Sequence, residues 1–547
     1  MSVKLFSFHG GMHLPSHKTE SLVQRLQQAG LPDQLFLPLR QHIGDTNKAL
    51  VSVGDHVLRG QVIADSASAA SAPIHAPTSG VISAIKAHPV AHPSGQTDTC
   101  IVLRVDHQDQ AIDAATNLTD DASVSELIER IHRAGIVGLG GATFPTALKL
   151  SRGRDCGIKT LIINGAECEP YITCDDMLMQ TRGDDIISGI GYLQRILQPQ
   201  QTLIGIEDDS PDAIQSMRQA LNANRLDNTE IVVIPTIYPS GSEKQLIQIL
   251  TGQEVPAGKL AFDIGLFCQN VASCAAIAQA LDQNQPLISR IVTVSGDGIH
   301  QPGNWETRLG TPISHLVKLA GGYKNTDTSR QHLVMGGPMM GFSLSSDAIP
   351  VVKASNNILV MQQQTIVQNP GYHDECIRCG QCAKVCPAQL LPQQLYWYAR
   401  AKNYEQCEQY HLSSCIECGC CSSVCPSQIP LVQYYRTAKS EIRATQQAQF
   451  KSDRARRRFE FREQRLLQKK QQTEEQRRRK REALKRKQTT TGSDTRLVDP
   501  IQAALERVQA KKQRQPVKPG NTTNLTPGQL RQIAEADTRR RAGREHS

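Results

Sequence analysis

The stretch from Cys376 to Pro426 reads Cys376-x-x-Cys379-x-x-Cys382-x-x-x-Cys386-Pro387 and then, after a linker, Cys415-x-x-Cys418-x-x-Cys421-x-x-x-Cys425-Pro426. Both runs have the same spacing, so the segment is an internal repeat. Each run places three thiols on one tight loop and a fourth at the start of the next element. The proline after the fourth cysteine keeps that cysteine out of a continuing helix. The repeat therefore indicates two linked metal-binding loops.

This spacing is typical of chains that hold two [4Fe–4S] clusters, in which the fourth cysteine of each run ligates the other cluster. It predicts cluster one at Cys376, Cys379, Cys382 and Cys425, and cluster two at Cys415, Cys418, Cys421 and Cys386. Zinc sites use two separated pairs of ligands rather than triplets. A disulfide framework needs an oxidising compartment, which no feature of this chain indicates. Iron–sulfur clusters are therefore the preferred interpretation.

The remaining cysteines have no ligand-like spacing, and we interpret them as reduced thiols. They are Cys100, Cys156, Cys168, Cys174, Cys268, Cys274, Cys407 and Cys420. Cys420 lies inside the second run, but its register matches Gln381 of the first run, so we do not expect it to be a ligand. Cys407 is expected to be a small buried apolar residue.

Length and charge indicate several domains followed by a basic tail. The chain has 547 residues and a net charge of +9. Residues 451–488 contain 17 Lys or Arg and 6 Asp or Glu, a local charge of +11, and +9 minus +11 leaves −2 for the rest. The basicity therefore belongs to the tail rather than to the cofactor domains. We recognise no signal peptide and no apolar run of membrane-spanning length.

The N-terminal segment, residues 1–123, has short β-type runs with Gly-Asp turns, which indicate a small β-barrel. The runs Val53–Ala64 and Ile74–Ile82 resemble the barrel-sandwich of biotinyl and lipoyl carrier domains. Those domains carry a modified lysine on the hairpin between their halves. The corresponding hairpin, Ser66–Ser71, has no lysine. We therefore expect a scaffold or docking domain without a carrier function.

Residues 124–285 have α/β patterning. A helix is expected over Ser125–Ala134, followed by a glycine-rich loop to Thr146 and a buried strand at Thr160–Ile163. A glycine-rich loop before a helix brings backbone N–H groups close to a phosphate, although the same loop often serves only as a tight turn. The strand ends in the polar run Asn164–Pro170, at the position where α/β sheets usually bind ligands. That run could equally cap the next helix.

Four motifs in this segment resemble those of the complex I flavoprotein subunit, in the same order. They are Gly138–Thr146, Asn164–Pro170, Tyr238–Glu243 and Gln269–Val271. The resemblance implies a Rossmann-like flavin and NADH domain whose binding residues are Gly138, Gly140, Gly141, Phe144, Lys149, Asn164, Glu167, Glu169, Tyr238, Gly241, Glu243 and Asn270. Glu243 would be the catalytic acid. Leu139 and Ser242 depart from the pattern, because the family usually has an arginine and a second acid there.

Three segments complete the chain. Residues 286–345 are β-rich and resemble the small β-grasp-like (SLBB-type) domain that follows the flavin domain in complex I. Residues 346–440 hold the two cysteine runs, with a helical pattern from Leu390 to Tyr410. Residues 441–547 form the basic, low-complexity tail, which we expect to be partly helical and mostly disordered. The predicted fold class is multidomain α/β and α+β.

The order of the segments resembles that of the RnfC family, one component of the Rnf (Rsx) ion-translocating electron transport complex. This resemblance implies hydride transfer from NADH to FMN, then single electrons through two [4Fe–4S] clusters to integral membrane and ferredoxin-like subunits. It implies a peripheral location on the cytoplasmic face of a bacterial inner membrane. The basic tail would contact a membrane surface or a partner in preference to nucleic acid. The alternatives are a soluble NADH dehydrogenase without ion transport, and a non-catalytic scaffold that contains clusters.

Overall fold

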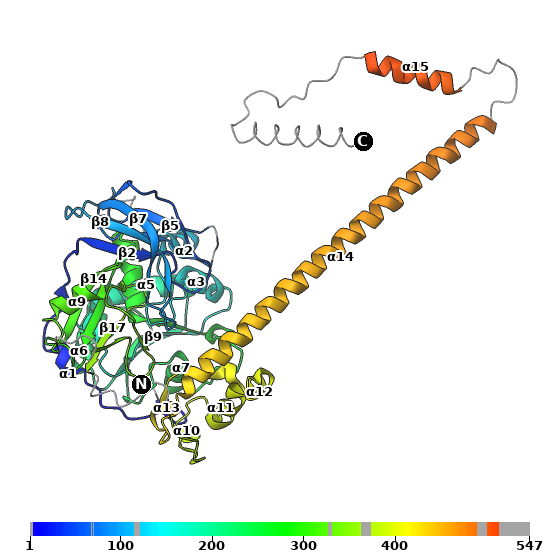
Figure 1. Ribbon diagram of the computed structural model, residues 1–547. Coiled ribbons are helices and arrows are strands. Elements are labelled where there is room, and N and C mark those ends of the chain that lie inside the picture. Colours follow the sequence, from blue (N-terminus) through cyan, green and yellow to red (C-terminus); the bar gives the residue numbers. More distant parts are fainter. Residues whose placement is uncertain are drawn as a thin grey trace. The chain divides into compact units, whose positions relative to one another are not determined.

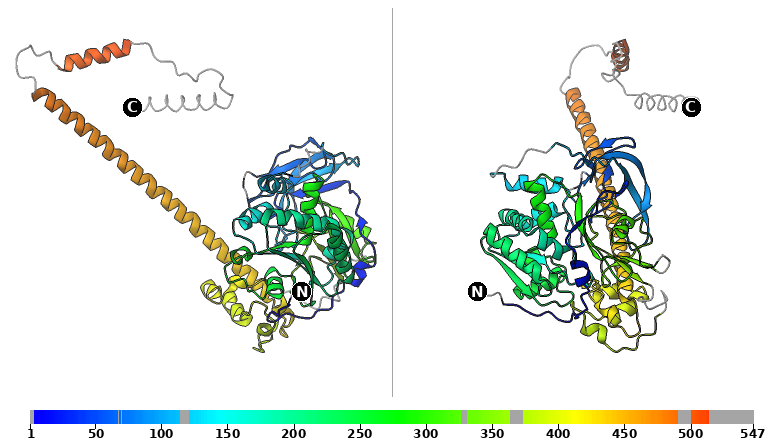
Figure 2. Two further views of the ribbon diagram at one scale, coloured as in Figure 1. Left: turned by 180° about the vertical axis from the view of Figure 1, so that it is seen from behind. Right: turned by 90° about the vertical axis from the view of Figure 1, so that its left-hand side faces the viewer.

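The structure of the chain is a computed structural model, which describes residues 4–66, 68, 70–113, 121–325, 331–362, 373–489 and 500–513. It has two compact units, Met1–Gln447 and Ala448–Ser547. In the first unit the barrel strands are blue, and the parallel sheet with its helices is cyan to green (Figures 1 and 2). Among the described residues, none of the helices combines the length and the apolar character that a membrane span requires.

Within the described part of the N-terminal segment, seven strands form the predicted barrel as two antiparallel sheets. One sheet has the order β2-β8-β7-β4 and the other β3-β5-β6. The strands are β2 (Gln34–Pro38), β3 (Lys48–Ala49), β4 (His56–Val57), β5 (Val62–Asp65), β6 (Ile74–His75), β7 (Gly80–Pro89) and β8 (Thr97–Val105). Apolar side chains such as Leu35, Ile63 and Ile101 are fully buried. This core is continuous with that of the α/β domain and of the second β-sheet.

The first residues of the chain form no strand of the two barrel sheets. We name residues 6–28 the N-terminal strap. Phe6 N–H donates to Ile249 O at 3.0 Å, and Gly11 N–H donates to Val385 O at 3.1 Å. The strap includes α1 (Thr19–Leu22) and ends in β1 (Gln27–Gln28), which pairs in parallel with β14. It therefore contacts the α/β domain, the cysteine-rich domain and the second β-sheet.

A parallel sheet of order β11-β10-β9-β12 forms the centre of the α/β domain. Its elements are α2 (Val124–Arg133), α3 (Thr146–Arg154), β9 (Thr160–Gly165), α4 (Cys174–Thr181), α5 (Gly183–Leu197), β10 (Gln201–Glu207), α6 (Pro211–Asn224), β11 (Thr229–Ile234), α7 (Glu243–Thr251), η1 (Ala261–Ile264), β12 (Leu266–Asn270) and α8 (Val271–Asp282). Leu161 and Ile163 pack into a core with α5 and α8, whereas Ile162 packs with α7 on the other face. Both faces are covered, as a parallel sheet requires.

Local chemistry explains two boundaries in this domain. Helix α2 begins after Ser123, whose side chain and that of Glu126 form a capping box, so the predicted start at Ser125 is one residue late. Strand β12 precedes helix α8, at a place where the sequence analysis assigned no strand. Five residues are too few to show a clear period.

The second β-sheet has the order β1-β14-β13-β17-β15-β16. Its strands after β1 are β13 (Ser289–Ser295), β14 (Gly303–Arg308), β15 (Gln331–Met335), β16 (Phe342–Ser343) and β17 (Asn357–Gln362), with helix α9 (Ile313–Leu319) beside them. Strand β17 lies beyond the predicted boundary at residue 345, yet it is central in the sheet. Just before it, the buried Lys353 donates to Pro73 O at 2.9 Å and Gly135 O at 2.7 Å. One ammonium group thus joins this domain to the barrel and the α/β domain.

The cysteine-rich domain is built from short helices around a small core. They are α10 (Gln381–Lys384), α11 (Pro392–Arg400), α12 (Tyr404–Gln409), η3 (Leu412–Ser414) and α13 (Cys420–Ser423). The predicted helical region Leu390–Tyr410 is two helices, because the chain turns at Lys402, which has a φ of 54°. Helix α14 (Leu431–Thr489) follows and continues into the second unit, which also contains α15 (Pro500–Gln513).

Close packing of α5 on α8 gives the first testable prediction. A Cβ at Gly189 would lie 1.9 Å from Cys274 O, whereas a Cβ at Gly191 would meet only Leu226 at 3.5 Å. Gly189→Ala should therefore destabilise the chain by roughly 1–3 kcal/mol through overpacking. Gly191→Ala, the matched control, should be neutral or stabilise by about 0.5–1 kcal/mol, since alanine favours a helix. Urea unfolding followed by circular dichroism measures both, and equal effects would contradict this packing.

Candidate functional site

The two cysteine runs meet in two pockets, each lined by four of the predicted ligand thiols. The first pocket contains Cys376, Cys379, Cys382 and Cys425. The second contains Cys386, Cys415, Cys418 and Cys421, together with Cys420. The structure therefore brings together the same two groups of four that the spacing predicted, and in each group the fourth thiol comes from the opposite run.

The backbone of the second run repeats that of the first, 39 positions later. Arg378 and Glu417 have φ values of 57° and 59°, and Gly380 and Gly419 have values of 77° and 83°. Left-handed residues at these positions curl each loop tightly enough for its three thiols to face one pocket. Helices α10 and α13 then begin at matching positions. The sequence repeat is thus a structural repeat.

The chemistry of these pockets fits iron–sulfur clusters. All four candidate ligands in each pocket are thiols, the donors that such clusters prefer. Backbone N–H groups donate to two of the sulfurs, from Leu390 to Cys386 and from Glu417 to Cys415, both at 3.4 Å. Such bonds stabilise sulfur in its negatively charged, ligating form. The pockets differ in exposure, because Cys379 is exposed whereas Cys418 is 7% exposed.

The carboxyl ends of β9 and β12 bring several predicted flavin residues together. Asn164 and Asn270 are register partners on the two strands. The Asn164 side chain donates to Gly241 O at 2.8 Å. A Cβ at Gly140 would lie 3.2 Å from the Asn270 Cβ, so the glycine-rich loop contacts the end of β12. The first, second and fourth flavin motifs therefore meet at this edge. The hydrogen bond from Asn164 to Gly241 O joins the third motif to the second.

Lys149 and Glu243 lie beside this edge. The Lys149 ammonium donates to Cys268 O at 2.6 Å and to the Glu243 carboxylate at 3.3 Å. Glu243 is the first residue of α7, and its side chain is 45% exposed. Phe144 and Gly138 close the glycine-rich loop through a bond of 2.9 Å from Gly138 N–H to Phe144 O. The predicted catalytic acid is therefore solvent-accessible and paired with a lysine.

Unsatisfied groups within the flavin motifs provide a test of whether a flavin nucleotide fits this edge. The buried atoms Thr146 Oγ1 and Gln269 Nε2 have no hydrogen-bond partner among the described residues. Gly141 has a φ of 106° and open space where a Cβ would lie. Free polar groups and an open glycine at the carboxyl edge of a parallel sheet are what a nucleotide requires. The residues present therefore fit such a ligand.

Asp175 is a residue of this edge that the sequence did not indicate. It accepts a bond of 2.6 Å from the Asn270 side chain, whose oxygen in turn caps α8 by accepting from Ala272 N–H at 2.9 Å. Burial raises the pKa of Asp175. Asp175 lies five positions beyond the Asn164–Pro170 motif, so no motif reveals it. It fixes which way the Asn270 amide faces.

Glu167 performs a capping role. Its carboxylate accepts from Asp175 N–H at 3.0 Å and Asp176 N–H at 3.1 Å, at the start of α4. Burial, followed by repulsion from Asp175, raises the pKa of Glu167. Glu167 therefore fits the alternative that the Asn164–Pro170 run caps the next helix. Both of its carboxylate oxygens accept hydrogen bonds from backbone N–H groups.

Glu169 contacts the β15–β16 turn of the second β-sheet, and Tyr238 contacts the cysteine-rich domain. Glu169 accepts from Met339 N–H at 2.7 Å and Met340 N–H at 2.9 Å. The Tyr238 hydroxyl donates to Cys418 O at 2.6 Å, and the side chain is 2% exposed. Burial raises the pKa of Glu169. The flavin motifs and the second cysteine pocket are therefore in direct contact.

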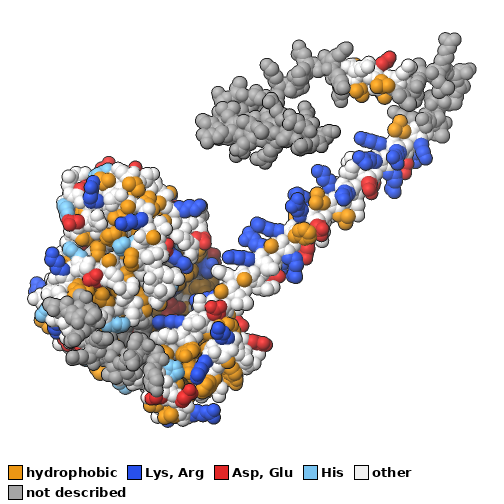
Figure 3. Space-filling view, viewed as in Figure 1, with side chains coloured by type: hydrophobic (Ala, Val, Ile, Leu, Met, Phe, Trp, Pro, Cys, Tyr) orange, Lys and Arg blue, Asp and Glu red, His pale blue; other side chains and the backbone are white. Residues whose placement is uncertain are grey.

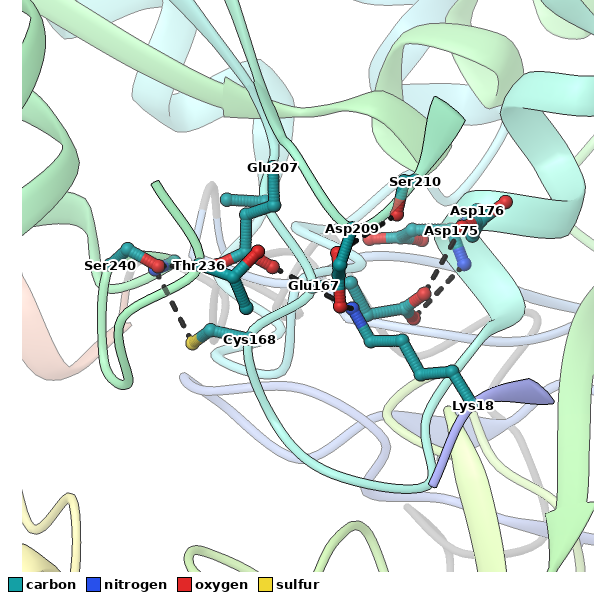
Figure 4. Close-up of polar contacts among 12 residues, drawn as sticks. Lys18, Glu167, Cys168, Asp175, Asp176, Glu207, Asp209, Ser210, Thr236 and Ser240 are labelled. Carbon is teal, nitrogen blue, oxygen red and sulfur yellow. Dashed lines mark hydrogen bonds and ion pairs between the residues drawn. The ribbon is translucent and has the colours of Figure 1, made fainter. Parts of the chain in front are cut away.

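A buried lysine from the N-terminal strap lies among carboxylates near the end of β10 (Figure 4). The Lys18 ammonium is 2.8 Å from Asp209 and 3.7 Å from Glu207, and its side chain is 6% exposed. Glu207 also accepts from the Ser240 hydroxyl. Burial raises the pKa of Glu207 to about 7, although Lys18 opposes that shift. No sequence signal distinguishes Lys18, because its partners are almost two hundred positions away.

Four family models match the chain in the order in which these domains occur. Residues 6–108 match the RnfC barrel sandwich hybrid domain, and residues 131–279 match the Nuo51 FMN-binding domain. Residues 291–343 match the SLBB domain, and residues 375–429 match a 4Fe-4S dicluster domain. The fold and site thus define an electron-transport protein of the flavin and iron–sulfur class. These matches confirm the predicted mixed α/β organisation, while the Rossmann-like and β-grasp-like labels stay predictions.

Three curated relatives that match most of the chain are all named as the C component of an ion-translocating oxidoreductase complex. The protein from Pectobacterium carotovorum subsp. carotovorum (strain PC1) is 47% identical over 93% of this chain and 66% of its own length. The Pectobacterium atrosepticum protein is 46% identical over 93% of this chain and 71% of its own length. The Yersinia pestis bv. Antiqua (strain Antiqua) protein is 48% identical over 85% of this chain and 74% of its own length. The chain belongs to this family, RnfC, as predicted, and spans about two thirds of the length of the first relative.

Among solved structures, a chain of an NAD+-reducing [NiFe]-hydrogenase in the H2-reduced state aligns with 59% of this chain and 61% of its own length. Its sequence identity is 16% and its TM-score is 0.42. We draw no functional conclusion from this likeness.

The buried carboxyl groups predict a pH dependence. Glu207 has a folded pKa of about 7, above its ordinary value of 4.5, so the folded state binds a proton that the unfolded state releases. The contribution of this proton to the free energy of unfolding is fully present below about pH 4.5 and is lost as the pH rises through 7. Glu207→Gln should flatten the fall in unfolding free energy between pH 5 and 7 by up to about 1.4 kcal/mol per pH unit.

Urea unfolding at several pH values measures this slope. The control is Glu230→Gln, at an exposed position on β11, which should leave the slope of the unmodified chain unchanged. Parallel slopes for Glu207→Gln and the unmodified chain would mean that Glu207 stays ionised when buried.

Proposed function

We propose that this chain is the NADH-side electron-transfer subunit of a membrane-bound ion-translocating oxidoreductase. The observation that carries the proposal is the contact between the flavin motifs and the second cysteine pocket, through Tyr238 and Cys418. A flavin, when bound, converts two-electron hydride donors such as NADH into one-electron donors that iron–sulfur clusters can accept. A chain that places both kinds of site side by side is suited to that conversion.

The residues of the carboxyl edge would bind and orient the nucleotides. Gly140 and Gly141 allow close approach of the ligand, and the side chains of Asn164 and Asn270 are fixed by neighbouring backbone and by Asp175. Lys149 provides a positive charge near Glu243, which we propose as the acid at the nicotinamide. Leu139 is buried and its N–H donates to Ser273 at 2.9 Å. Leu139 therefore packs beneath the glycine-rich loop, and its uncharged side chain cannot form an ion pair with a phosphate.

The eight thiols would ligate two [4Fe–4S] clusters with the crossed pattern described above. Electrons would then leave the chain for other subunits of the Rnf/Rsx type, which are integral membrane and ferredoxin-like proteins. We propose that the chain is a peripheral subunit at the cytoplasmic face of the membrane; the relatives' name, as components of an ion-translocating complex, supports the association with a membrane complex. A soluble dehydrogenase without ion transport is the alternative, and the barrel-sandwich domain has no purpose in that case.

Metal and flavin content tests the proposal. The chain purified without oxygen should contain about eight irons and one FMN, and its visible absorbance should bleach on addition of NADH. Cys418→Ala should lose about four irons, because one cluster would lack a ligand. Cys407→Ala is the matched control, since Cys407 is fully buried but lines neither pocket. Eight irons without flavin or bleaching would leave only an iron–sulfur relay.

We also propose that the basic part of α14, residues 448–489, contacts an anionic membrane surface. In this segment Lys and Arg side chains alternate with exposed apolar side chains (Figure 3). Phe450, Phe459 and Phe461 are 60–68% exposed. Arg457 and Arg458 lie between them beside a surface hollow. Cationic and aromatic side chains on one helix suit the boundary between lipid headgroups and acyl chains.

Vesicle binding measures this contact. The full chain should bind phosphatidylglycerol vesicles more tightly than phosphatidylcholine vesicles, and salt should weaken binding. Replacing Arg456, Arg457 and Arg458 together by Gln should weaken it roughly hundredfold, at about 1 kcal/mol for each charge. Replacing Gln471 and Gln472 by Ser should have no effect. Binding to nucleic acid but not to vesicles would refute the assignment.

A further inference from the structure

The middle of the N-terminal strap joins two domains through adjacent backbone groups. Gly11 N–H donates to Val385 O of the cysteine-rich domain at 3.1 Å. The next residue, Met12, donates its N–H to Tyr238 O at 2.8 Å and accepts from Tyr238 N–H at 2.9 Å. In Figure 2 the dark blue strap runs from near the N-terminus toward the yellow cysteine-rich domain. Val385 directly precedes a thiol of the second pocket, and Tyr238 begins the third flavin motif, so the strap bonds both sites.

The approach of the strap to each domain is close enough to require glycine. Gly10 and Gly11 have φ values of 72° and 80°, a conformation that favours glycine. A Cβ at Gly10 would lie 2.6 Å from Val385 O, and a Cβ at Gly11 would lie 2.9 Å from Tyr238 O. Both obstructing atoms belong to the backbone, which cannot rotate away as a side chain can. A side chain at either position would therefore push one domain away from the strap.

On both sides of these glycines the strap is held by the α/β domain. Before them, Phe6 N–H donates to Ile249 O in α7 at 3.0 Å. After them, Ser16 O accepts from Tyr171 N–H, directly beyond the second flavin motif, at 2.8 Å. The Lys18 ammonium is then 2.8 Å from a carboxylate that follows β10. Because both flanks are fixed to one domain, the segment between them is a fixed support for the cysteine-rich domain rather than a loose connection.

Electron transfer between two cofactors depends on their separation, as do other reactions in which a protein holds the reacting groups in place. We propose that Gly10, Gly11 and Met12 are positioning residues that set the separation between the flavin site and the second cysteine pocket, and so the rate of electron transfer between them. This inference rests on the proposed function, since it requires a flavin and a cluster at these sites. Each transfer moves one electron from reduced flavin to oxidised cluster. NADH supplies the electrons, and the protons lost by the flavin pass to water.

Rapid mixing of the anaerobic, cofactor-loaded full chain with NADH tests the proposal. Absorbance follows flavin reduction, and freeze-quenched electron paramagnetic resonance follows cluster reduction. Gly10→Ala should slow cluster reduction roughly ten- to hundredfold and leave flavin reduction unchanged, because only the second step crosses the strap. Gly11→Ala, which displaces the opposite partner, should do the same. Gly30→Ala is the matched control, since Gly30 has a φ of 63° but open space where a Cβ would lie.

Hydrogen exchange of the same protein measures the contact without turnover. The N–H groups of Gly11, Met12 and Tyr238 should exchange slowly in the unmodified chain, because all three are hydrogen-bonded across the strap. Gly10→Ala should speed their exchange while the strands β7 and β8 of the barrel keep their protection. Gly30→Ala should leave the exchange of the strap unchanged.

The outcomes separate this inference from the function on which it rests. An unmodified chain that lacks flavin or clusters would refute the proposed function itself. Intact cofactors with an unchanged rate of cluster reduction in Gly10→Ala and Gly11→Ala would refute only the role of the strap. An equal loss of rate in Gly30→Ala would also refute it, because backbone strain alone would then explain the effect. Fast exchange at Gly11 and Met12 in the unmodified chain would refute it even if neither strap variant folds.

Discussion

Direct packing of the carboxyl edge of the parallel sheet against the Cys418 loop is the constraint on which the rest of the structure depends. The Tyr238 hydroxyl donates directly to Cys418 O, and Glu169 accepts from Met339 and Met340 N–H, in the β15–β16 turn, which packs against Gly419. The Tyr238 hydroxyl donor is buried, and so is the Glu169 carboxyl group. Each would cost free energy if it lost its partner. These contacts therefore join the α/β domain, the second β-sheet and the cysteine-rich domain.

The N-terminal strap reinforces the same region. Met12 bridges to Tyr238, and Gly11 N–H donates to Val385 O in the cysteine-rich domain. Further along the strap, Lys18 offsets the charges of Glu207 and Asp209 in a buried setting. Removing one member of such a group leaves an uncompensated charge, which typically costs about 3–5 kcal/mol. Residues from the start of the chain thus stabilise a site whose motifs lie much later.

Sequence reasoning was most informative where chemistry fixes the spacing. The cysteine repeat predicted both groups of four thiols, because a cluster tolerates few arrangements of its ligands. The flavin motifs located the carboxyl edge of the sheet but did not distinguish side chains that face a ligand from those that bond backbone. Glu167 and Asn164 lie three positions apart in one motif, yet one caps a helix and the other faces β12. That difference depends on where α4 lies. Lys18, Asp175 and strand β17 were missed because distant contacts define them.

The crossed pattern of cysteines also bears on how the protein is made. Cys386 completes the pocket of the second run, and Cys425 completes that of the first. A nascent chain that has emerged only as far as Cys386 would therefore hold three ligands for one proposed cluster and a single ligand for the other. The second-run cluster could not be completed before Cys421 had left the ribosome, nor the first-run cluster before Cys425 had. Completion of both clusters would thus follow synthesis of the α/β domain, whose Tyr238 contacts Cys418.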